Sequence, residues 1–182
     1  MEHTDSHIIA QVLAGHTHHF DTLVERYSRQ IFALVVRIAD SPEDAEEITH
    51  DVFIKAFRHL VRFNGTSSFA TWLYRIAYNT AISATRRHRP EIRFSDEQLA
   101  AISETGIDDA LDDPTEQRIA LLHQALDMLP PDDKALVTLY YMEDHPISEI
   151  ASITGLTVSN VKIRLMRTRK KLYLLMTRLD ET

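Results

Sequence analysis

The chain has 182 residues, of which 44% are hydrophobic and 26% charged, as in a folded soluble protein of one or two small domains. It contains no cysteine, which excludes disulfides and thiolate metal sites and agrees with a reducing cytoplasm. It has no apolar run of about 18 residues, and its first residues are not those of a signal peptide. We therefore expect a cytoplasmic protein with no membrane insertion.

The net charge of −7 is unevenly distributed along the chain. Between residues 91 and 116 there are nine acidic side chains against Arg93 alone, a local charge of −8, so the rest of the chain sums to about +1. Residues 150–179 contain seven basic side chains and no acidic one. A local field of this kind favours a nucleic-acid partner for the C-terminal part despite the acidic total.

Three amphipathic helices are expected in the first half. Apolar residues recur every three or four positions over 20–38, 45–60 and 69–77. The third helix continues to a basic end, Arg86-Arg87-His88-Arg89. The signals for a helix start, a turn and a helix end are, in order, Ser41-Pro42, Asn64-Gly65 and Pro90.

The second half begins after an acidic segment with little apolar periodicity. We expect 91–113 to be a flexible linker, because a charged, apolar-poor segment should not pack, and we expect the flanking parts to be mobile about it. Asp113 and Pro114 predict the start of a helix, as N-cap and first residue. The sequence thus predicts an all-α protein of two small domains, 1–90 and 114–182, joined by an acidic linker.

The segment 147–162 has the pattern of a helix-turn-helix. Ala151 is small enough for two helices to cross closely, and Gly155 tolerates the positive φ of the short turn. Thr157 is a suitable N-cap for the second helix, with Val158, Val161 and Leu165 facing inward. The outer face is then left to Ser159, Asn160, Lys162, Ile163, Arg164 and Arg167. Such a face reads base edges and holds phosphates, although a solvated basic helical hairpin is the simpler alternative.

The first half narrows the class further. The segments 44–57, Phe63-Asn64-Gly65 and 69–79 resemble the second conserved domain of bacterial RNA polymerase sigma factors of the extracytoplasmic-function group. The segment from 126 to 172 resembles that group's fourth domain, and the resemblance covers nearly the whole chain except the linker. The group lacks the third domain of larger sigma factors, in agreement with a linker at that place.

The resemblance implies roles for matching positions. The helix from Asp44 to Leu60 would dock on the largest polymerase subunit, where carboxylates meet basic residues and aromatics supply buried area. The candidates are Asp44, Glu47, Asp51, Phe53 and Phe57, with the alternative that either phenylalanine belongs to the core.

The loop that follows would capture a flipped base of the −10 promoter element, which needs aromatic walls and small polar groups. The candidates are Phe63, Asn64, Ser67, Ser68, Phe69, Trp72, Arg75 and Asn79, with Arg86 and Arg87 on phosphate. Trp72 can equally be a core residue. The −35 element would be read by Thr157, Ser159, Asn160, Lys162, Arg164 and Arg167.

We therefore expect a sigma factor that binds core RNA polymerase and promoter DNA, recognises −35 and −10 elements and stabilises melted DNA. It would be neither an enzyme nor cofactor-dependent, and an anti-sigma protein would hold it inactive. One alternative is a dimeric helix-turn-helix regulator, which would not need the docking helix. Another is a helical metal-dependent phosphohydrolase, suggested by His50-Asp51 and the histidines at 16, 18 and 19.

Overall fold

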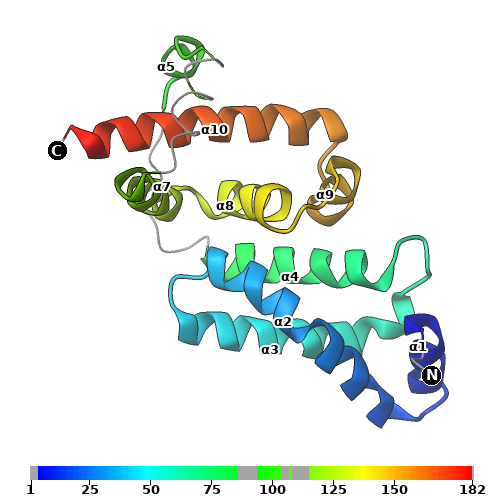
Figure 1. Ribbon diagram of the computed structural model, residues 1–182. Helices are drawn as coiled ribbons and strands as arrows, with labels where there is room; N and C mark the ends of the chain where they lie inside the picture. The colour runs from blue at the N-terminus through cyan, green and yellow to red at the C-terminus, as the bar shows by residue number, and fades with distance from the viewer. Residues whose placement is uncertain (1–3, 86–93, 104–106, 108–114, 182) are drawn as a thin grey trace.

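The computed structural model describes residues 4–85, 94–103, 107 and 115–181 (Figure 1). Within these ranges every regular element is a helix and no strand is found, so the predicted all-α class is confirmed. No described helix is long and apolar enough to cross a membrane.

The first part is a bundle of α2, α3 and α4 with a short helix at its start. Its elements are α1 (Asp5–Leu13), η1 (Thr17–His19), α2 (Phe20–Ile38), α3 (Pro42–His59), η2 (Leu60–Arg62) and α4 (Phe69–Thr85). Apolar residues at helical spacing on α2, such as Leu23, Ile31 and Leu34, are fully buried. Ser41 caps α3, and Pro42 occupies its first turn as predicted.

Helix α1 was not expected from the sequence. Thr4 caps it, and Ile8, Ile9 and Val12 are buried. Asp5 connects it to α2 through an ion pair with Arg26 and a hydrogen bond from the Tyr27 hydroxyl to Oδ2 at 2.5 Å. Burial and this carboxylate raise the pKa of Tyr27 to about 12, so the hydroxyl remains a donor.

The second part contains the helix-turn-helix. Its elements are α7 (Glu116–Met128), α8 (Pro131–Val137), η3 (Thr138–Met142, a π-helical turn), α9 (Ile147–Thr154) and α10 (Val158–Asp180). Helix α7 begins at Glu116 with Thr115 in the N-cap position, two residues later than the expected N-cap Asp113; Asp113 and Pro114 themselves lie outside the described residues. Both Asp113 and Thr115 belong to capping residue types, and the local sequence did not distinguish them.

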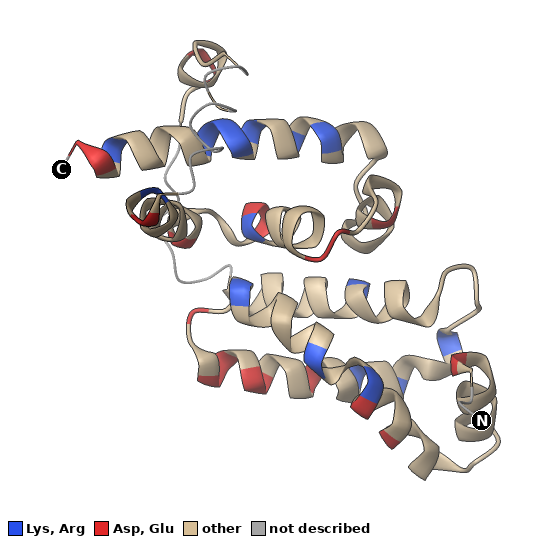
Figure 2. Ribbon diagram, in the orientation of Figure 1, with Lys and Arg blue, Asp and Glu red and all other residues tan. Residues whose placement is uncertain are grey.

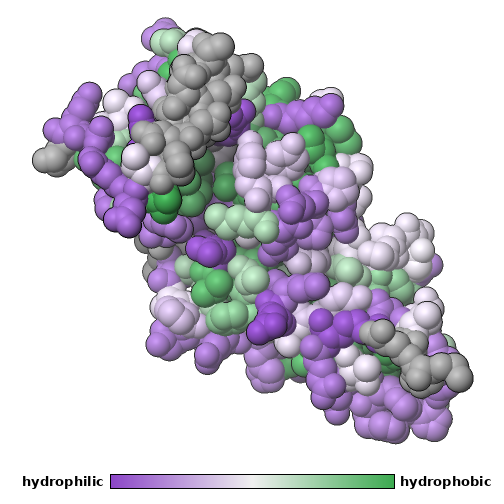
Figure 3. All heavy atoms as spheres, viewed as in Figure 1, coloured by the Kyte–Doolittle hydropathy of each residue, from purple (hydrophilic) through white to green (hydrophobic). Residues whose placement is uncertain are grey.

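The two parts pack directly against each other. Leu136, Leu139 and Ile150 of the second part join one continuous core with α2, α3 and α4. Helix α4 lies beside α9, α2 contacts α8, and the Tyr78 hydroxyl donates to Asp132 at 2.8 Å. The space between the ribbons in Figure 1 is filled by side chains in Figure 3. We expected the two parts to move independently. In this structure they are instead packed together, because they share buried apolar surface.

Part of the acidic segment also packs, contrary to expectation. Helix α5 (Asp96–Ala100) begins with a capping box in which Ser95 and Gln98 bond to each other's backbone N–H. Leu99 and Ile107 are buried, and α5 contacts α10. A few apolar residues at the right places are enough to hold an otherwise charged segment on a helix surface.

Candidate nucleic-acid interface

The helix-turn-helix is formed by α9 and α10. Gly155 ends α9 in the left-handed region at φ 76°, and the Thr157 side chain accepts from the Asn160 backbone N at 3.1 Å, as predicted for the turn and the cap. Val161 and Leu165 are buried in the shared core. Val158, expected to face inward, is instead 44% exposed, because it lies in the first turn of α10 and projects past the core.

The outer side of α10 carries most of the predicted −35 residues. Thr157, Ser159, Asn160, Lys162 and Arg167 are exposed, and Ile163 adds an exposed apolar side chain. Figure 2 shows the basic residues of this helix as blue bands along its length. The exposed polar residues lie towards the N-terminal end of the helix and many of the cations further along, which is the distribution a helix lying in the major groove needs.

Arg164 differs from its neighbours because its guanidinium is directed towards α8. Its Nη2 lies 3.0 Å from Oδ1 of the buried Asp133, and Lys171 Nζ lies 2.6 Å from Oδ2 of the same carboxylate. One anion therefore joins two cations of α10 to α8. Arg164 therefore helps to hold α10 against α8, and the sequence did not indicate this because nothing local links residues 133, 164 and 171.

The five predicted docking residues of α3 divide between two faces. Asp44, Glu47 and Asp51 are exposed and line a polar pocket of about 880 Å³ beside the end of α4. Phe53 and Phe57 line an apolar groove of about 800 Å³ between α3 and α2. Phe53 is buried and belongs to the core, whereas Phe57 is 42% exposed and packs edge-on to Phe20 at 5.1 Å between ring centroids.

The predicted base-capture loop rests on an aromatic cluster. The rings of Phe63, Phe69 and Trp72 are 5.4 to 5.8 Å apart, and Phe69 is buried while the other two are half-buried. Asn64 Oδ1 accepts from the Thr66 backbone N at 3.2 Å, so its side chain closes the turn. Phe69 therefore supports the loop from the core, and the exposed Asn64 closes its turn.

The remaining −10 candidates differ in their surroundings. Ser68 Oγ accepts from the Thr71 backbone N at 3.0 Å and so caps α4, and Ser67 is half-buried. Arg75 and Asn79 are exposed one turn apart on α4, where the Asn79 amide donates to the Arg75 carbonyl at 2.9 Å. Arg86 and Arg87 lie outside the described residues.

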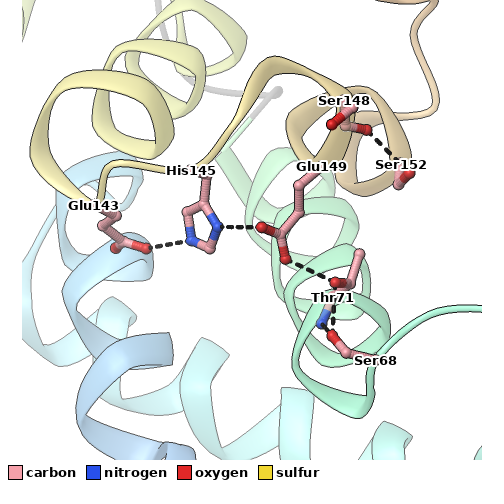
Figure 4. A network of polar contacts seen from close by, with 7 residues as sticks. All are labelled: Ser68, Thr71, Glu143, His145, Ser148, Glu149 and Ser152. Atoms are coloured by element: carbon pink, nitrogen blue, oxygen red, sulfur yellow. Dashed lines mark hydrogen bonds and ion pairs between the residues drawn. The ribbon is translucent and has the colours of Figure 1, made fainter.

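A polar cluster absent from the predicted set joins α4 to the helix-turn-helix (Figure 4). His145 lies between two carboxylates, with Nδ1 3.1 Å from Glu149 Oε2 and Nε2 3.3 Å from Glu143 Oε2. The Thr71 hydroxyl donates to Glu149 Oε1 at 2.7 Å, and the Tyr74 ring packs edge-on to His145. We call His145, Glu143, Glu149, Thr71 and Tyr74 the interface cluster.

Within the interface cluster, His145 and the two carboxylates each favour the charged form of the other. The hydrogen bond to Glu143 raises the pKa of His145 and outweighs burial, with Glu149 adding to the effect. Burial acts to raise the pKa of Glu149, but hydrogen bonds from His145 and Thr71 outweigh it and the net shift is downward. Burial and the nearby Glu143 raise the pKa of Tyr74. The sequence showed only a turn at His145-Pro146, because Thr71, which bonds Glu149 of the cluster, comes from a different helix 78 positions away.

The interface cluster predicts a pH dependence of stability. The pKa of His145 is raised in the folded protein. Its contribution to the free energy of unfolding is therefore complete below the ordinary histidine pKa of 6.5 and is lost as the pH rises through the folded-state pKa. Glu149 has a lowered pKa, so its contribution is present above 4.5 and is lost at lower pH. The unfolding temperature Tm should therefore decrease as the pH is raised above 6.5. In His145→Gln this decrease should be smaller.

The measurement is thermal unfolding followed by circular dichroism between about pH 5.5 and 8.5. His123→Gln, which removes an exposed histidine of α7, is the matched control and should retain the wild-type slope. An unchanged slope in His145→Gln would show that the cluster does not couple protonation to folding.

A helical bundle packed on a helix-turn-helix with a basic reading helix defines a DNA-binding protein of the helix-turn-helix class. The family model for sigma-70 region 2 matches residues 23–91, and that for sigma-70 region 4 matches 119–172. The chain belongs to the sigma-70 family of RNA polymerase sigma factors, in its extracytoplasmic-function group.

Individual relatives agree with this assignment. The RNA polymerase sigma-H factor of Pseudomonas aeruginosa is 33% identical over 177 residues, covering 91% of this chain and 90% of that protein. The ECF RNA polymerase sigma-E factor of Escherichia coli is 31% identical over 175 residues, covering 92% and 91%. Both relatives are matched along nearly their whole length, so the likeness extends through both parts.

Two solved structures share the fold. CnrH in complex with the cytosolic domain of CnrY superimposes with a TM-score of 0.64 at 22% identity, covering 94% of this chain and 96% of that one. RpoE in complex with the anti-sigma factor NepR from Bartonella quintana gives 0.62 at 18% identity, covering 87% and 96%.

Proposed function

We propose that this protein binds core RNA polymerase and directs promoter-specific initiation by recognising −35 and −10 elements and stabilising melted DNA. The observation that carries the proposal is the exposed start of α10, where Ser159, Asn160 and Lys162 project from a helix fixed to the core by Val161 and Leu165. A rigidly held helix that carries polar and basic side chains, with no acidic residue before Asp180 at its end, suits the major groove. A dimeric regulator is not favoured, because both sigma regions are matched in order.

Core docking is supported by the two faces of α3. The apolar groove is lined by Phe57, whose side chain is 42% exposed. A partner helix that fills the groove would cover this phenylalanine. The exposed carboxylates Asp44, Glu47 and Asp51 on the other side would meet basic residues of the polymerase.

The −10 assignment is supported by the loop before α4. Its aromatic cluster holds Phe63 and Trp72 half-exposed above the buried Phe69, and half-exposed rings can stack with an unstacked base. Arg75 and Asn79 follow on the exposed side of α4, in reach of a single strand that leaves the loop. Contacts of this kind, made only to melted DNA, would shift the equilibrium towards the open promoter.

Simultaneous contact with both elements requires the two parts to separate. The elements are about 25 base pairs apart by their numbering, which is roughly 85 Å of duplex. A compact chain of this length has a radius of gyration of about 16 Å. The packed arrangement joined by the interface cluster is therefore the form we assign to the free protein or to its complex with an anti-sigma protein, and core binding would open it.

Transcription with purified components tests the proposal. Core polymerase with this protein should produce run-off transcripts from some promoter fragments of the source genome, and core polymerase alone should not. The proposal fails if no fragment supports core-dependent initiation. It fails equally if the protein alone binds tightly to a palindromic site, which would favour a dimeric regulator.

Variants of α10 test the −35 assignment. Asn160→Ala should reduce discrimination between the preferred and altered −35 sequences about tenfold, since a side chain that reads a base edge is worth about 1–3 kcal/mol. Lys170→Ala, further along the helix, should weaken binding to both sequences alike because it contacts phosphate. Competition binding by the holoenzyme measures both. Equal discrimination in Asn160→Ala and wild type would contradict the assignment.

A further inference from the structure

The described parts of the acidic segment, residues 94–103 and 107, lie against α10. Figure 1 shows α5 on the side of α10 opposite to α7 and α8, and the two helices are in contact. The described stretch 94–103 has two acidic residues and no basic one, so its charge is opposite to that of α10. An acidic element therefore occupies part of a surface that would otherwise face solvent or DNA.

Two polar contacts fix the first half of the segment. Asp96 Oδ1 lies 2.5 Å from Arg167 Nη2, and Arg167 is one of the predicted −35 residues. The guanidinium of Arg178 lies over the Phe94 ring, 4.7 Å from its centroid. The segment thus contacts two cations of α10 that are three turns apart.

Two buried apolar side chains, Ile107 and Leu99, attach the segment in addition to the exposed ion pair. Ile107 is 2% exposed and borders a pocket of about 270 Å³ together with Lys162, Met166 and Arg169 of α10. Leu99 of α5 is also buried. An exposed ion pair contributes little free energy, whereas a buried apolar side chain contributes more. The segment therefore contacts α10 both at Arg167 and beside Lys162, another predicted −35 residue.

We propose that this segment is an intramolecular cover that competes with DNA for the reading helix. The proposal rests on the proposed function, because Arg167, which the segment contacts, and Lys162, which it borders, are assigned to the −35 element. Asp96 and a DNA phosphate would both require Arg167, and Ile107 occupies space beside Lys162 that a duplex backbone would need. The free chain then binds duplex weakly, and DNA in the polymerase complex displaces the segment.

Duplex binding by the full-length chain tests the cover. The variant Asp96→Asn/Ile107→Ser removes one carboxylate and one anchor and should bind a fluorescent mixed-sequence duplex of about 30 base pairs about tenfold more tightly at low salt. The control Glu97→Gln/Ala101→Ser makes the same changes in charge and polarity at exposed positions of the segment and should stay within about twofold of wild type. Equal affinity of the cover variant and wild type overturns the proposal.

Failure of the cover and failure of the proposed function are distinguishable. If Lys162→Ala and Lys170→Ala weaken duplex binding while the cover variant does not strengthen it, only the cover is wrong. If neither lysine variant changes binding, the DNA face itself is misassigned, and both proposals fail. Circular dichroism of each variant checks that the helices are intact.

Thiol accessibility tests the attachment without DNA affinity. The chain has no cysteine, so Ile107→Cys introduces a single thiol. In the free protein it should react with a disulfide reagent at least about tenfold more slowly than Ala101→Cys, an exposed position of the same segment. Addition of duplex should speed the reaction at 107. Equal rates at the two positions, or no effect of duplex, would overturn the proposal.

Discussion

Replacement of Asp133 by alanine should lower the free energy of unfolding by about 3 kcal/mol, or roughly 6–10 °C in Tm for a chain of this size. The Asp133 side chain is 5% exposed and is the shared partner of Arg164 and Lys171. Without it, two cations remain side by side against α8 with no counter-charge. Because Arg164 is 33% exposed, solvent reduces the penalty below that of a fully buried pair.

Chemical denaturation of Asp133→Ala and of Asp127→Ala measures this effect. Asp127 is 86% exposed and lies 3.8 Å from Lys134, so its removal should cost less than about 1 kcal/mol. Similar losses in the two variants would show that the Asp133 contacts do not stabilise the fold. Asp133→Ala should also weaken −35 binding indirectly, since the carboxylate positions α10 on α8.

Replacement of Phe57 by alanine should weaken binding to core polymerase about thirtyfold, or roughly 2 kcal/mol. The ring lies at the edge of the apolar groove between α2 and α3 and is half in solvent, so a partner would bury what the free protein leaves exposed. Its removal should change the free energy of unfolding little, because the ring already contacts water on one side.

Titration of labelled protein with core polymerase gives the dissociation constants. Val61→Ala is the matched control, since Val61 is a more exposed apolar residue on η2 that does not line the groove. An unchanged constant for Phe57→Ala would move the docking surface away from the groove. In that case the carboxylate face of α3, with Asp44 and Asp51, would be the next surface to vary.

Local signals predicted many helix ends correctly. The predicted helix ends are found at Ser41-Pro42, Gly155 and Thr157, because a cap or a positive φ depends on only a few neighbouring residues. The orientation of Val158 and the start of α7 were wrong for a related reason. Near a helix end, neighbouring residues are chemically similar, and packing decides which one is used.

The candidate site was predictable in part. The exposed start of α10 follows from helical periodicity once Val161 and Leu165 are placed inside. Periodicity alone did not separate Phe53, which is buried, from Phe57, which is exposed, because both lie along one side of α3 four residues apart. Arg164 was grouped with the DNA-facing residues because its carboxylate partner comes from another helix.

The amino-acid sequence by itself determined the all-helical class, the helix-turn-helix and the family, because these depend on periodicity, capping and motif order within short segments. Only the tertiary structure decided which charges are partnered and how the parts meet. In the interface cluster Thr71 bonds Glu149, and Asp96 of the acidic segment pairs with Arg167 of α10. Contacts between residues more than 70 positions apart depend on how the helices pack, and no local pattern encodes that packing.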